Sequence, residues 1–588
     1  MVAPLDHNCL QYQRHQPTAP LKTTLNSLPF FEDFTGNTPY PDPTKWLDKS
    51  VYINNTMGID VISRGVATFD ALNARSIPYD PTNPYALLYA DSLTSIPFDL
   101  STYFPNDSLY LSFFYQPQGN GFAPETQDSF MLFFKASNGL WKRVWAVPGI
   151  PLQPFEQVMI AVTDTTYFHS NFQFRFINKA SININDDVWN LDYIRFDANR
   201  NPADTLVKDI ATTLPPSPIL NDYTALPYRQ FAADINKELR TQHAFTAHNR
   251  YSTLQSVTSG YQAREISTGT PLAAVSGSSG NLPPYTAQIY SFPVYPISFT
   301  PSNNYSKVIF ENTYYAGIVA PENKINDTVI HQQVFDNYLA YDDGTAEKSY
   351  FIKQTATLPA KVAIEYHLNQ PDTLRGFAIY FGRQVPVATS KFFTVNVFKD
   401  IAYNGGSDVK LYEQQLYFTA YTDEVNKFWY YKFNDPIPLS AGSFYLSIIQ
   451  PAFSGSDSLY YGLDVNRVGS NHAYYSVYNK WESSTVSGAI MLRPLIGNDF
   501  IASAIKDVST IEKPYILYPN PVSSQLYLQS QQPIGNKVHY EVVDLQGRVL
   551  RKGKYHESIS VEGLTTGVYF IRIFDGTKAT TTLRFVKE

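Results

Sequence analysis

The run Val568-Tyr569-Phe570-Ile571-Arg572-Ile573-Phe574, at residues 568–574, is rich in aromatic and β-branched residues and is typical of a short β-strand. Period-two alternation that starts at Leu526 and again at Val538 predicts further short strands before it. Glycines between these runs supply turns, because glycine adopts positive φ without a Cβ clash. Pro519 and Pro521 remove backbone donors and mark the first turn of this region. The C-terminal region therefore predicts about seven strands, enough for a small β-sandwich.

Three motifs follow one another in this region: Tyr518-Pro519-Asn520-Pro521, then Asp544-Leu545-Gln546-Gly547-Arg548, then Leu564-Thr565-Thr566-Gly567-Val568-Tyr569. Together they resemble the type A C-terminal sorting domain of Bacteroidetes type IX secretion substrates, a β-sandwich that directs cargo through the outer membrane. The resemblance covers residues 514–588. The sorting-motif residues that it implies are Tyr518, Pro519, Asn520, Pro521, Asp544, Gly547, Leu564, Gly567, Val568 and Tyr569.

The same resemblance implies partners and a location. The partners are the type IX translocon, its shuttle proteins and a sortase-like processing enzyme. The location is outside the cell or on the outer-membrane surface, reached through the periplasm. Such cargo first needs an export signal, and the residues before Cys9 contain no apolar signal core. We therefore expect that the signal was cleaved, omitted or lost to a misassigned start, so Met1 need not be the natural beginning.

The composition of the 588 residues favours an all-β protein. Hydrophobic residues make up 44% and charged residues 16%, while 44 tyrosines, 39 phenylalanines and 40 prolines favour strands and proline-broken loops over helices. A chain of this length exceeds what one core usually serves, so we expect roughly three to five domains. The expected fold is a row of β-sandwich or jelly-roll domains that ends in a small immunoglobulin-like sandwich.

Charge and cysteine content exclude several classes of function. The net charge of -7 argues against a nucleic-acid partner, which needs clustered lysine and arginine to neutralise phosphate. The chain contains no window of about eighteen apolar residues, so no transmembrane helix is expected. Cys9 is the single cysteine, which excludes an intrachain disulfide.

Changes in composition divide the chain into five segments. We expect a flexible lead-in at residues 1–28, a first β-domain at 29–198, an immunoglobulin- or fibronectin-like spacer at 205–330, a second, jelly-roll-like sandwich at 335–497 and the sorting domain at 514–588. In the first domain, Phe172, Phe174 and Phe176 alternate with Gln173 and Arg175, which predicts a half-buried strand. In the spacer we expect one short helix at 233–240 and a flexible Ser- and Gly-rich segment at 275–284.

The first domain also resembles a known module. Its runs Phe30-Phe31-Glu32-Asp33-Phe34, Gly65-Val66-Ala67-Thr68-Phe69-Asp70 and Trp189-Asn190-Leu191-Asp192-Tyr193-Ile194 are similar to the MAM and concanavalin-like jelly-roll modules of large bacterial surface proteins. Such modules bind proteins or glycans far more often than they catalyse. The run that begins at Tyr338 resembles a module that often precedes type IX sorting domains, and no activity follows from that resemblance.

Acidic residues near turns suggest calcium sites, because hard cations take several oxygen ligands that β-sandwich loops can supply. The candidates are Asp342, Asp343, Glu347 and Asp464 in the 335–497 domain, and Glu32, Asp33 and Asp192 in the 29–198 domain. The alternative is a turn with solvated acids, since Asp and Gly are the residues that tight turns prefer. Calcium is the one cofactor that the sequence suggests.

Motifs of catalysis are missing from the sequence. There is no G-x-S-x-G elbow and no His-Glu-x-x-His motif, so no catalytic residue is assigned. Paired carboxylates of a glycosidase would come together only in the fold. His243 and His248 stand five residues apart, on opposite faces if they lie in a strand, and we expect solvated loop residues and not a metal pair. Trp141 and Trp145 share strand parity, so one face could hold both.

We therefore expect a secreted or cell-surface multi-domain β protein, exported by the type IX system, whose cargo domains act in adhesion or in binding a protein or glycan ligand. The alternative is an extracellular hydrolase, a glycosidase or peptidase whose catalytic residues the sequence does not reveal. A deep pocket lined by convergent carboxylates would favour the hydrolase.

Overall fold

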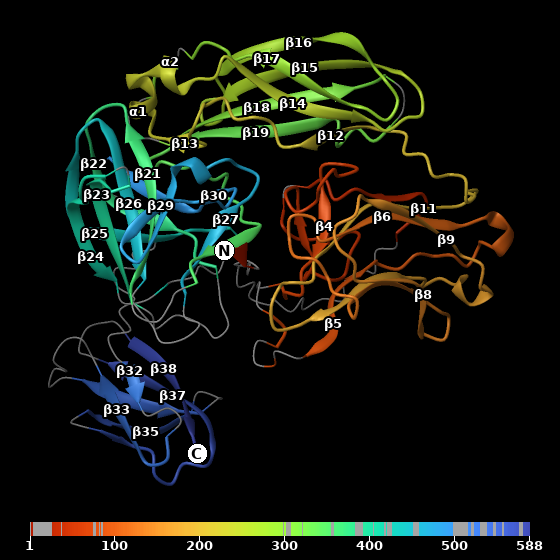
Figure 1. Ribbon diagram of the computed structural model, residues 1–588. Helices are drawn as coiled ribbons and strands as arrows, with labels where there is room; N and C mark the ends of the chain where they lie inside the picture. Colours follow the sequence, from red (N-terminus) through yellow and green to blue (C-terminus); the bar gives the residue numbers. More distant parts are fainter. Residues whose placement is uncertain are drawn as a thin grey trace. The chain divides into compact units, whose positions relative to one another are not determined.

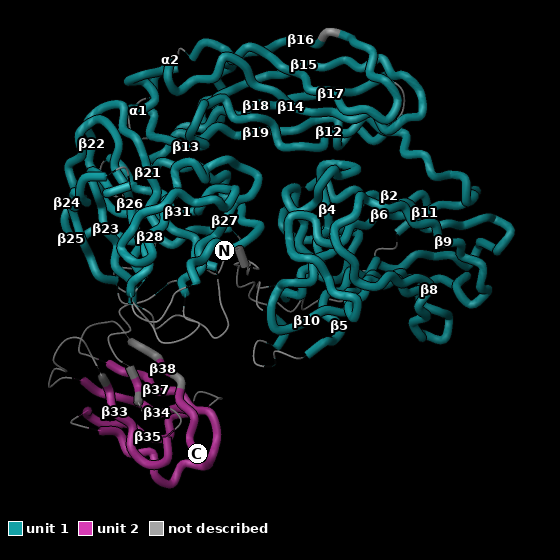
Figure 2. The backbone as a smooth tube through the Cα atoms, viewed as in Figure 1, with its two compact units in different colours: residues 1–498 teal, residues 499–588 magenta. Residues whose placement is uncertain are grey.

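A computed structural model shows how the strands are arranged. It describes residues 2–3, 26–36, 38–74, 78–80, 83, 86–297, 299–301, 307–319, 322–353, 358–382, 392–403, 405–416, 419, 426–450, 458–497, 516–518, 522–529, 538–544, 548–555, 558–574 and 580–588. The chain divides into two compact units, Met1–Asn498 and Asp499–Glu588, which Figure 2 draws in different colours. Both units are built almost entirely of β-strands, as the composition predicts (Figure 1).

Residues 30–197 form two antiparallel sheets, which we call the N-terminal sandwich. One sheet has the order β3 (Tyr52–Asn54), β4 (Val66–Phe69), β11 (Trp189–Asp197), β6 (Tyr110–Pro117) and β9 (Glu156–Ala161), with β2 (Phe30–Glu32) also paired to β11. The other has the order β5 (Leu87–Thr94), β10 (Phe174–Ser181), β7 (Ser129–Lys135) and β8 (Trp141–Pro148). Short 3₁₀ turns lie at Pro105–Asp107 and Thr165–Tyr167. β11 is the last strand of this sheet along the chain, yet it lies between β4 and β6. The sheet is therefore complete only when β11 is in place.

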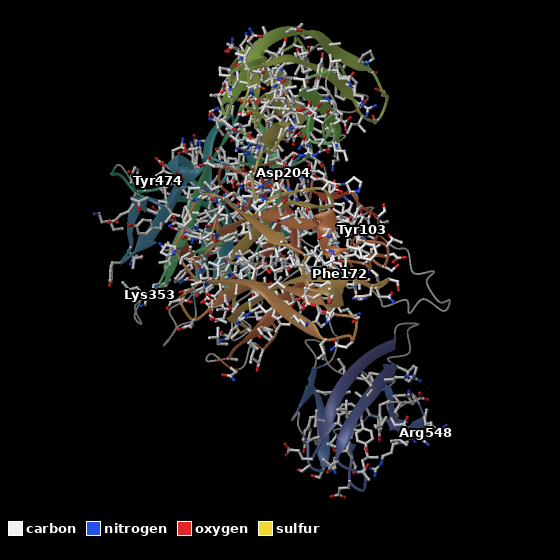
Figure 3. The ribbon with its side chains drawn as sticks, turned by 90° about the vertical axis from the view of Figure 1, so that its right-hand side faces the viewer. Tyr103, Phe172, Asp204, Lys353, Tyr474 and Arg548 are labelled. Carbon is white, nitrogen blue, oxygen red and sulfur yellow. The ribbon has the colours of Figure 1, made fainter. Side chains whose placement is uncertain are left out.

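Aromatic side chains fill the space between these two sheets. Phe172, Phe174 and Phe176 are each 0% exposed, which confirms the side that the alternation assigned to them. Figure 3 shows Phe172 among the strands of the N-terminal sandwich. Phe176 meets Phe113 of the opposite sheet edge to face, with ring centroids 4.8 Å apart. Such ring pairs contribute about 0.5–1.5 kcal/mol beyond the area that they bury.

A β-bulge separates Trp141 from Trp145. The pairing of β7 with β8 shifts between Leu132 and Phe133, so Trp145 lies opposite Leu132 and Trp141 opposite Lys135. One extra residue reverses the side of the sheet that the side chains beyond it face. Trp145 therefore packs against the core, whereas Trp141 lies on the outer face. Strand parity allowed one face to hold both tryptophans, and the bulge places them on opposite faces.

Residues 210–335 form two further sheets. The first has the order β12 (Ile210–Leu214), β14 (Gln242–Asn249), β17 (Ala287–Pro293). The second has the order β13 (Ala225–Leu226), β19 (Thr328–Phe335), β18 (Val308–Gly317), β15 (Gln255–Glu265), β16 (Pro271–Leu282). The segment expected to be flexible at 275–284 lies mostly in β16, which pairs with β15 through main-chain bonds that need no bulky side chain. Two short helices, α1 (Tyr228–Ala233) and α2 (Ile235–Glu238), replace the single helix expected at 233–240.

Three sheets follow, formed by residues 348–496 together with Val2–Ala3. The first has the order β1 (Val2–Ala3), β20 (Lys348–Phe351), β27 (Tyr460–Asp464), β30 (Ala489–Ile490). The second has the order β24 (Val409–Leu416), β23 (Phe393–Asp400), β26 (Gly442–Gln450), β21 (Ala360–Leu368), β28 (Ala473–Val477), β29 (Lys480–Ser483). The third has the order β25 (Trp429–Leu439), β22 (Asp372–Ile379), β31 (Leu492–Ile496). A 3₁₀ turn lies at Ser470–His472. Val2 and Ala3, expected in the flexible lead-in, pair with Tyr350 and Ser349. Cys9 and the rest of the lead-in up to residue 25 lie outside the described residues.

One hydrophobic core runs through both of these regions, from Ile210 to Ile496. Tyr223 stacks on Tyr341 with ring centroids 4.9 Å apart, and its hydroxyl donates a 3.1 Å hydrogen bond to the carbonyl of His367. The region expected to be a spacer is therefore packed against the strands that follow it. The boundary at residues 330–335 stays a prediction.

The C-terminal unit consists of a three-stranded and a four-stranded sheet. The first has the order β32 (Ile516–Tyr518), β33 (Gln525–Gln529), β36 (Ile559–Ser560), and the second β35 (Val549–Lys554), β34 (His539–Val543), β37 (Gly567–Phe574), β38 (Thr580–Lys587). Leu526 from the first sheet and Ile571 from the second are both 0% exposed in one core. The strand count and the shared core agree with the small sandwich predicted from the sequence.

His243 and His248 lie on β14 and not in a loop as expected. Their positions in the strand put them on opposite faces. His243 is 0% exposed, and its Nδ1 lies 2.6 Å from the hydroxyl oxygen of Tyr314. Burial lowers the pKa of His243 to about 4. The imidazole is therefore a neutral core group at pH 7.

Replacing Phe174 by alanine should lower the free energy of unfolding of the first unit by about 3–5 kcal/mol, because its fully buried ring would leave a cavity. Phe104→Ala is the matched control: this side chain is 65% exposed, and its loss should cost less than about 0.5 kcal/mol. Urea unfolding followed by tryptophan fluorescence measures both changes. Equal effects of the two substitutions would contradict the assignment of the core.

Burial of His243 should give the first unit a contribution to stability that is lost as the pH decreases from 6.5 towards 4, the ordinary and the folded pKa of this histidine. In this window the unfolded chain binds a proton that the buried imidazole does not bind, which favours unfolding by on the order of 3 kcal/mol at the acid end. Buried acids with a raised pKa, such as Glu347 at about 7, contribute with the opposite sign, so the test compares variants. His243→Gln, which keeps hydrogen-bonding groups but does not titrate, should change the pH dependence of stability by removing this loss. His539→Gln, at an exposed position, should leave it unchanged. Melting temperatures across this pH range decide the point, and a wild-type slope in His243→Gln would disprove it.

Candidate functional site

Asp544, directly after β34, is paired with Arg548, directly before β35. Arg548 Nε donates to Asp544 Oδ2 over 2.7 Å, and the Arg548 backbone N donates to Oδ1 over 3.0 Å. The Arg548 side chain, labelled in Figure 3, is 76% exposed. An exposed ion pair of this kind contributes little stability, and it links the end of β34 to the start of β35. Gly547 and Pro519 to Pro521 lie outside the described residues, and the backbone of Tyr518 ends β32.

The last sorting motif leads from a turn into β37. The Tyr569 hydroxyl donates to the carbonyl of Thr565 over 2.8 Å, and its ring stacks on Phe585 with centroids 5.6 Å apart. Gly567 and Val568 are the first residues of β37, which pairs with the C-terminal strand β38. The motif therefore attaches this turn to the end of the chain.

The C-terminal strand is also bound to the start of the domain. Val522 N donates to Val586 O over 2.8 Å, and Glu588 N donates to Val522 O over 2.9 Å. Leu564 is partly buried against the same core. The described residues of the sorting motifs are therefore parts of one folded domain.

The acidic turn at Asp342 is held by protein donors. Asp342 forms a two-bond ion pair with Arg493, whose Nε lies 3.1 Å from Oδ2 and whose second nitrogen bonds Oδ1. Asp342 Oδ1 also accepts from Gly344 N, and Asp343 Oδ1 accepts from Thr345 N, both over 3.0 Å. The charge of Asp342 is therefore already paired with a guanidinium.

Asp343, Glu347 and Asp464 lie close together behind this turn. Asp464 Oδ2 accepts from Asp343 N over 2.7 Å, and Glu347 Oε2 accepts from Val465 N over 3.1 Å. Burial and the neighbouring acids raise the pKa of Glu347 to about 7 and that of Asp464 well above its usual range. Of the four calcium candidates in this region, the fold therefore brings Asp343, Glu347 and Asp464 together. The fourth, Asp342, is paired with Arg493.

The acidic set of the N-terminal sandwich is likewise satisfied by protein donors. Glu32 Oε2 accepts from Trp46 Nε1 over 3.1 Å. Asp192 accepts from the backbone N and the hydroxyl of Ser63 over 2.9 and 3.0 Å. Asp33 accepts from two asparagine side chains. A calcium ion in either acidic set would have to displace such donors, and calcium binding by these residues stays a prediction.

The outer face of the sheet β5–β10–β7–β8 gathers basic and aromatic side chains, and we call it the basic face. Its members are Phe133 and Lys135 on β7, Trp141 and Arg143 on β8, and Arg175, Ile177 and Lys179 on β10, with the exposed Tyr89 of β5 opposite Lys179. They point outwards because their strand neighbours, among them Phe174 and Phe176, point into the core.

Trp141 is the centre of this basic face. The guanidinium carbon of Arg175 lies 4.2 Å from the Trp141 ring centroid, and Lys135 Nζ lies 6.0 Å from it. Arg175 Nε donates to Thr94 Oγ1 over 2.7 Å, and Lys135 Nζ donates to Gln173 Oε1 over 2.8 Å. These hydrogen bonds hold both cations beside the indole. A guanidinium binds carboxylate or sulfate groups, and an indole offers a flat apolar surface for stacking.

The basic face has little acidic charge near it. Strands β7, β8 and β10 contain no Asp or Glu, although the whole chain carries a net charge of -7. At the β5 edge, Asp48 accepts from the backbone N of Thr94 over 2.6 Å. Lys142, also on β8, is directed away from this face to Asp164, 2.8 Å from its Nζ. The absence of acids from three neighbouring strands is the sequence signal that could have identified the face.

Two clefts open on the N-terminal sandwich. One, of about 300 Å³, is lined by residues that include Phe34, Thr35, Tyr52, Asn54 and Arg64. The other, of about 360 Å³, is lined by residues that include Tyr193, Arg195, Asp197, Asp204 and Lys208. Asp204, labelled in Figure 3, is paired with Arg200 at 2.7 Å. A glycosidase needs one carboxyl as acid and a second as base or nucleophile. Among the described residues, the lining of the first cleft contains no carboxyl, and of the two carboxyls in the second cleft, Asp204 is already paired with Arg200.

The aromatic residues late in the 335–497 region are divided between core and surface. Trp481 is 4% exposed and donates from Nε1 to Asp408 over 3.0 Å. Tyr474, labelled in Figure 3, packs edge to face on Tyr403 with centroids 4.9 Å apart. Tyr478 is 63% exposed. These residues therefore do not form one aromatic platform.

In the part of the chain that the structure describes, no helix has the length and apolar character needed to cross a membrane.

Comparison with known proteins identifies the C-terminal domain. Residues 516–588 match the family described as "Secretion system C-terminal sorting domain". The search of curated proteins finds no match.

Solved structures share only weak similarity with the chain. The tandem CBM22-1-CBM22-2 domain of Paenibacillus barcinonensis Xyn10C has 8% identity over 73% of this chain and 94% of that one, with a TM-score of 0.18. A calcium binding mutant of Bacteroides uniformis β-glucuronidase 2 has 13% identity over 46% of this chain and 29% of that one, with a TM-score of 0.19. Ruminococcus gnavus β-glucuronidase has 10% identity over 46% and 38%, with a TM-score of 0.17. Similarities at these TM-scores say nothing about the function of this chain.

The chain thus ends in a type IX sorting domain at residues 516–588, and this domain implies export followed by secretion or attachment to the cell surface.

Proposed function

We propose that the exported chain binds an anionic glycan through the basic face of the N-terminal sandwich. The observation that carries this proposal is the pair of cations held beside Trp141, with Arg175 4.2 Å from the ring centroid. Uronic acid or sulfated sugars present a carboxylate or sulfate beside a sugar ring. Arginine recognises the first group and an indole stacks on the second.

Electrostatics favours a ligand of this charge. Lys135, Arg143, Arg175 and Lys179 create a local positive potential on a chain with a net charge of -7. Such a patch attracts anionic ligands and repels cationic ones, and its effect weakens as salt screens the charges. Binding should therefore be stronger at low ionic strength. Binding of such a ligand outside the cell supports an adhesive or retaining role in this proposal.

The C-terminal unit acts as the export signal in this proposal. Its partners are the type IX translocon and shuttle proteins, followed by a sortase-like enzyme that removes the domain. The spread of its motifs over several strands, with Val522 bonded to Val586 at the end of the chain, supports recognition of a folded surface. A short peptide from the C-terminus would not reproduce that surface.

Deletion of residues 516–588 should leave the protein in the periplasm of a type IX secreting host, because the domain that the translocon receives is lost. Fractionation and immunoblotting of periplasm and culture medium measure this. Attaching residues 516–588 to a periplasmic reporter should produce its export. Normal secretion of the truncated chain would refute the role of the domain.

Trp141→Ala and Arg175→Ala should each weaken binding to polygalacturonate by about tenfold or more, since a central contact contributes more than about 1.4 kcal/mol. Affinity electrophoresis and calorimetry of the full chain measure this, with a neutral polysaccharide for comparison. Arg264→Ala is the control, because Arg264 is an exposed arginine 2.6 Å from Glu311 and lies outside the basic face. Unchanged binding in both variants, or equal binding of the neutral polymer, would rule out the proposal. Release of reducing ends during the assay would support the hydrolase alternative instead.

A further inference from the structure

Three carboxylates meet at one end of the N-terminal sandwich. Glu125 and Asp128 lie in the segment that leads into β7, and Asp187 lies between β10 and β11. One carboxylate oxygen of each residue lies within 4.8 Å of those of the other two. None of the three belongs to the acidic sets that the sequence singled out or to the basic face.

Two members of this cluster are buried and only half satisfied. Asp128 is 1% exposed and Asp187 is 0% exposed. Asp128 Oδ2 accepts from Glu125 N, and Asp187 Oδ2 accepts from Ser181 N, each over 2.6 Å. The Oδ1 atoms of both are buried and accept no hydrogen bond from a backbone or basic donor in the described part of the chain, and the same holds for Asp186. The carboxyl groups of Glu125, Asp128 and Asp187 lie within hydrogen-bonding reach of one another. Buried acceptors without a donor are uncommon, so these oxygens are expected to bind a proton or a cation.

The cluster also lacks a positive counter-charge. Burial, followed by the neighbouring acids, raises the pKa of Asp187 to about 8. Burial and the contacts with Glu125 raise the pKa of Asp128 and of Asp186 to about 6. The ion pairs of the described sandwich involve other carboxylates. Either protons or a cation must compensate this charge.

The backbone holds the two segments in position. Gly149 N donates to Asp128 O over 3.0 Å, and Val188 N donates to Phe122 O over 3.1 Å. A side chain at position 149 would collide with the carbonyl of Glu125, so glycine permits this close approach. The carboxylate oxygens are therefore placed by main-chain bonds before any ligand arrives.

We propose that Glu125, Asp128 and Asp187, with Asp186 beside them, bind a calcium ion that joins the segment before β7 to the segment before β11. Calcium supplies the positive charge that the ion pairs among the described side chains do not bring to this cluster, and it prefers oxygen ligands at several positions. The donor set contains no sulfur or imidazole, which zinc and copper favour. Glu125 is exposed and connects the site with solvent. In contrast, the oxygens of Asp192 already accept from Ser63.

Calorimetric titration of CaCl₂ into the metal-free full chain tests this proposal. Wild-type protein should bind with a Kd of about 10⁻⁴–10⁻³ M or tighter, as extracellular calcium modules do. Asp187→Asn keeps the shape of the side chain and removes its charge, and it should weaken binding about tenfold or more. Asp164→Asn is the matched control in the same sandwich, because Asp164 already accepts from Lys142 and Thr166. This control should bind calcium as the wild type does.

Stability in EDTA provides a second readout. Without metal, Asp187→Asn should melt at or above the wild-type temperature, because an uncharged amide removes the repulsion, or the proton uptake, that a buried carboxyl beside other acids imposes. A large loss of stability in EDTA would mean that the carboxylate serves the fold without a metal, and it would overturn the proposal. Absence of calcium binding in the wild type would overturn it as well. So would a calcium signal that Asp187→Asn leaves unchanged, which would point to Asp343, Glu347 and Asp464.

Discussion

Burial of aromatic and aliphatic side chains between facing sheets is the interaction on which both units depend. Phe113 and Phe176 join the two sheets of the N-terminal sandwich, and Leu526 and Ile571 do the same in the C-terminal unit. Cys9 is the lone cysteine, so no intrachain disulfide restricts the unfolded chain. Stability must therefore come from apolar area removed from water, at about 25 cal/mol per Å². This requirement explains why the chain is rich in Phe and Tyr.

The same dry interior determines how its acidic groups behave. A buried carboxylate needs hydrogen-bond donors or a positive charge. Asp192 has the donors of Ser63, and Asp342 has the guanidinium of Arg493. Asp128 and Asp187 have one backbone donor each, and the described residues offer their second oxygens no partner other than the neighbouring acids. A buried carboxylate oxygen that lacks a protein donor therefore marks a candidate cation site better than a high local frequency of acidic residues in the sequence does.

Much of the fold could be predicted from local pattern, and the failures have physical causes. Alternation placed Phe174 inside because a strand repeats every two residues. It failed at Trp141, because the bulge in β8 adds one residue and reverses the face. It gave no sign that residues 275–282 belong to a strand, since β16 is held by main-chain bonds to β15. His243 was expected in solvent, but packing against Tyr314 buries it.

By itself, the sequence determined an all-β chain and its sorting domain, because strand periodicity and ordered motifs are local properties of neighbouring residues. Only the tertiary structure decided which distant side chains meet. Strand pairing places Arg175 beside Trp141, and it brings Glu125 and Asp128 to Asp187 across two different connections. These contacts depend on the register of β7 with β8 and β10, where a shift of one residue turns a core position into a surface position.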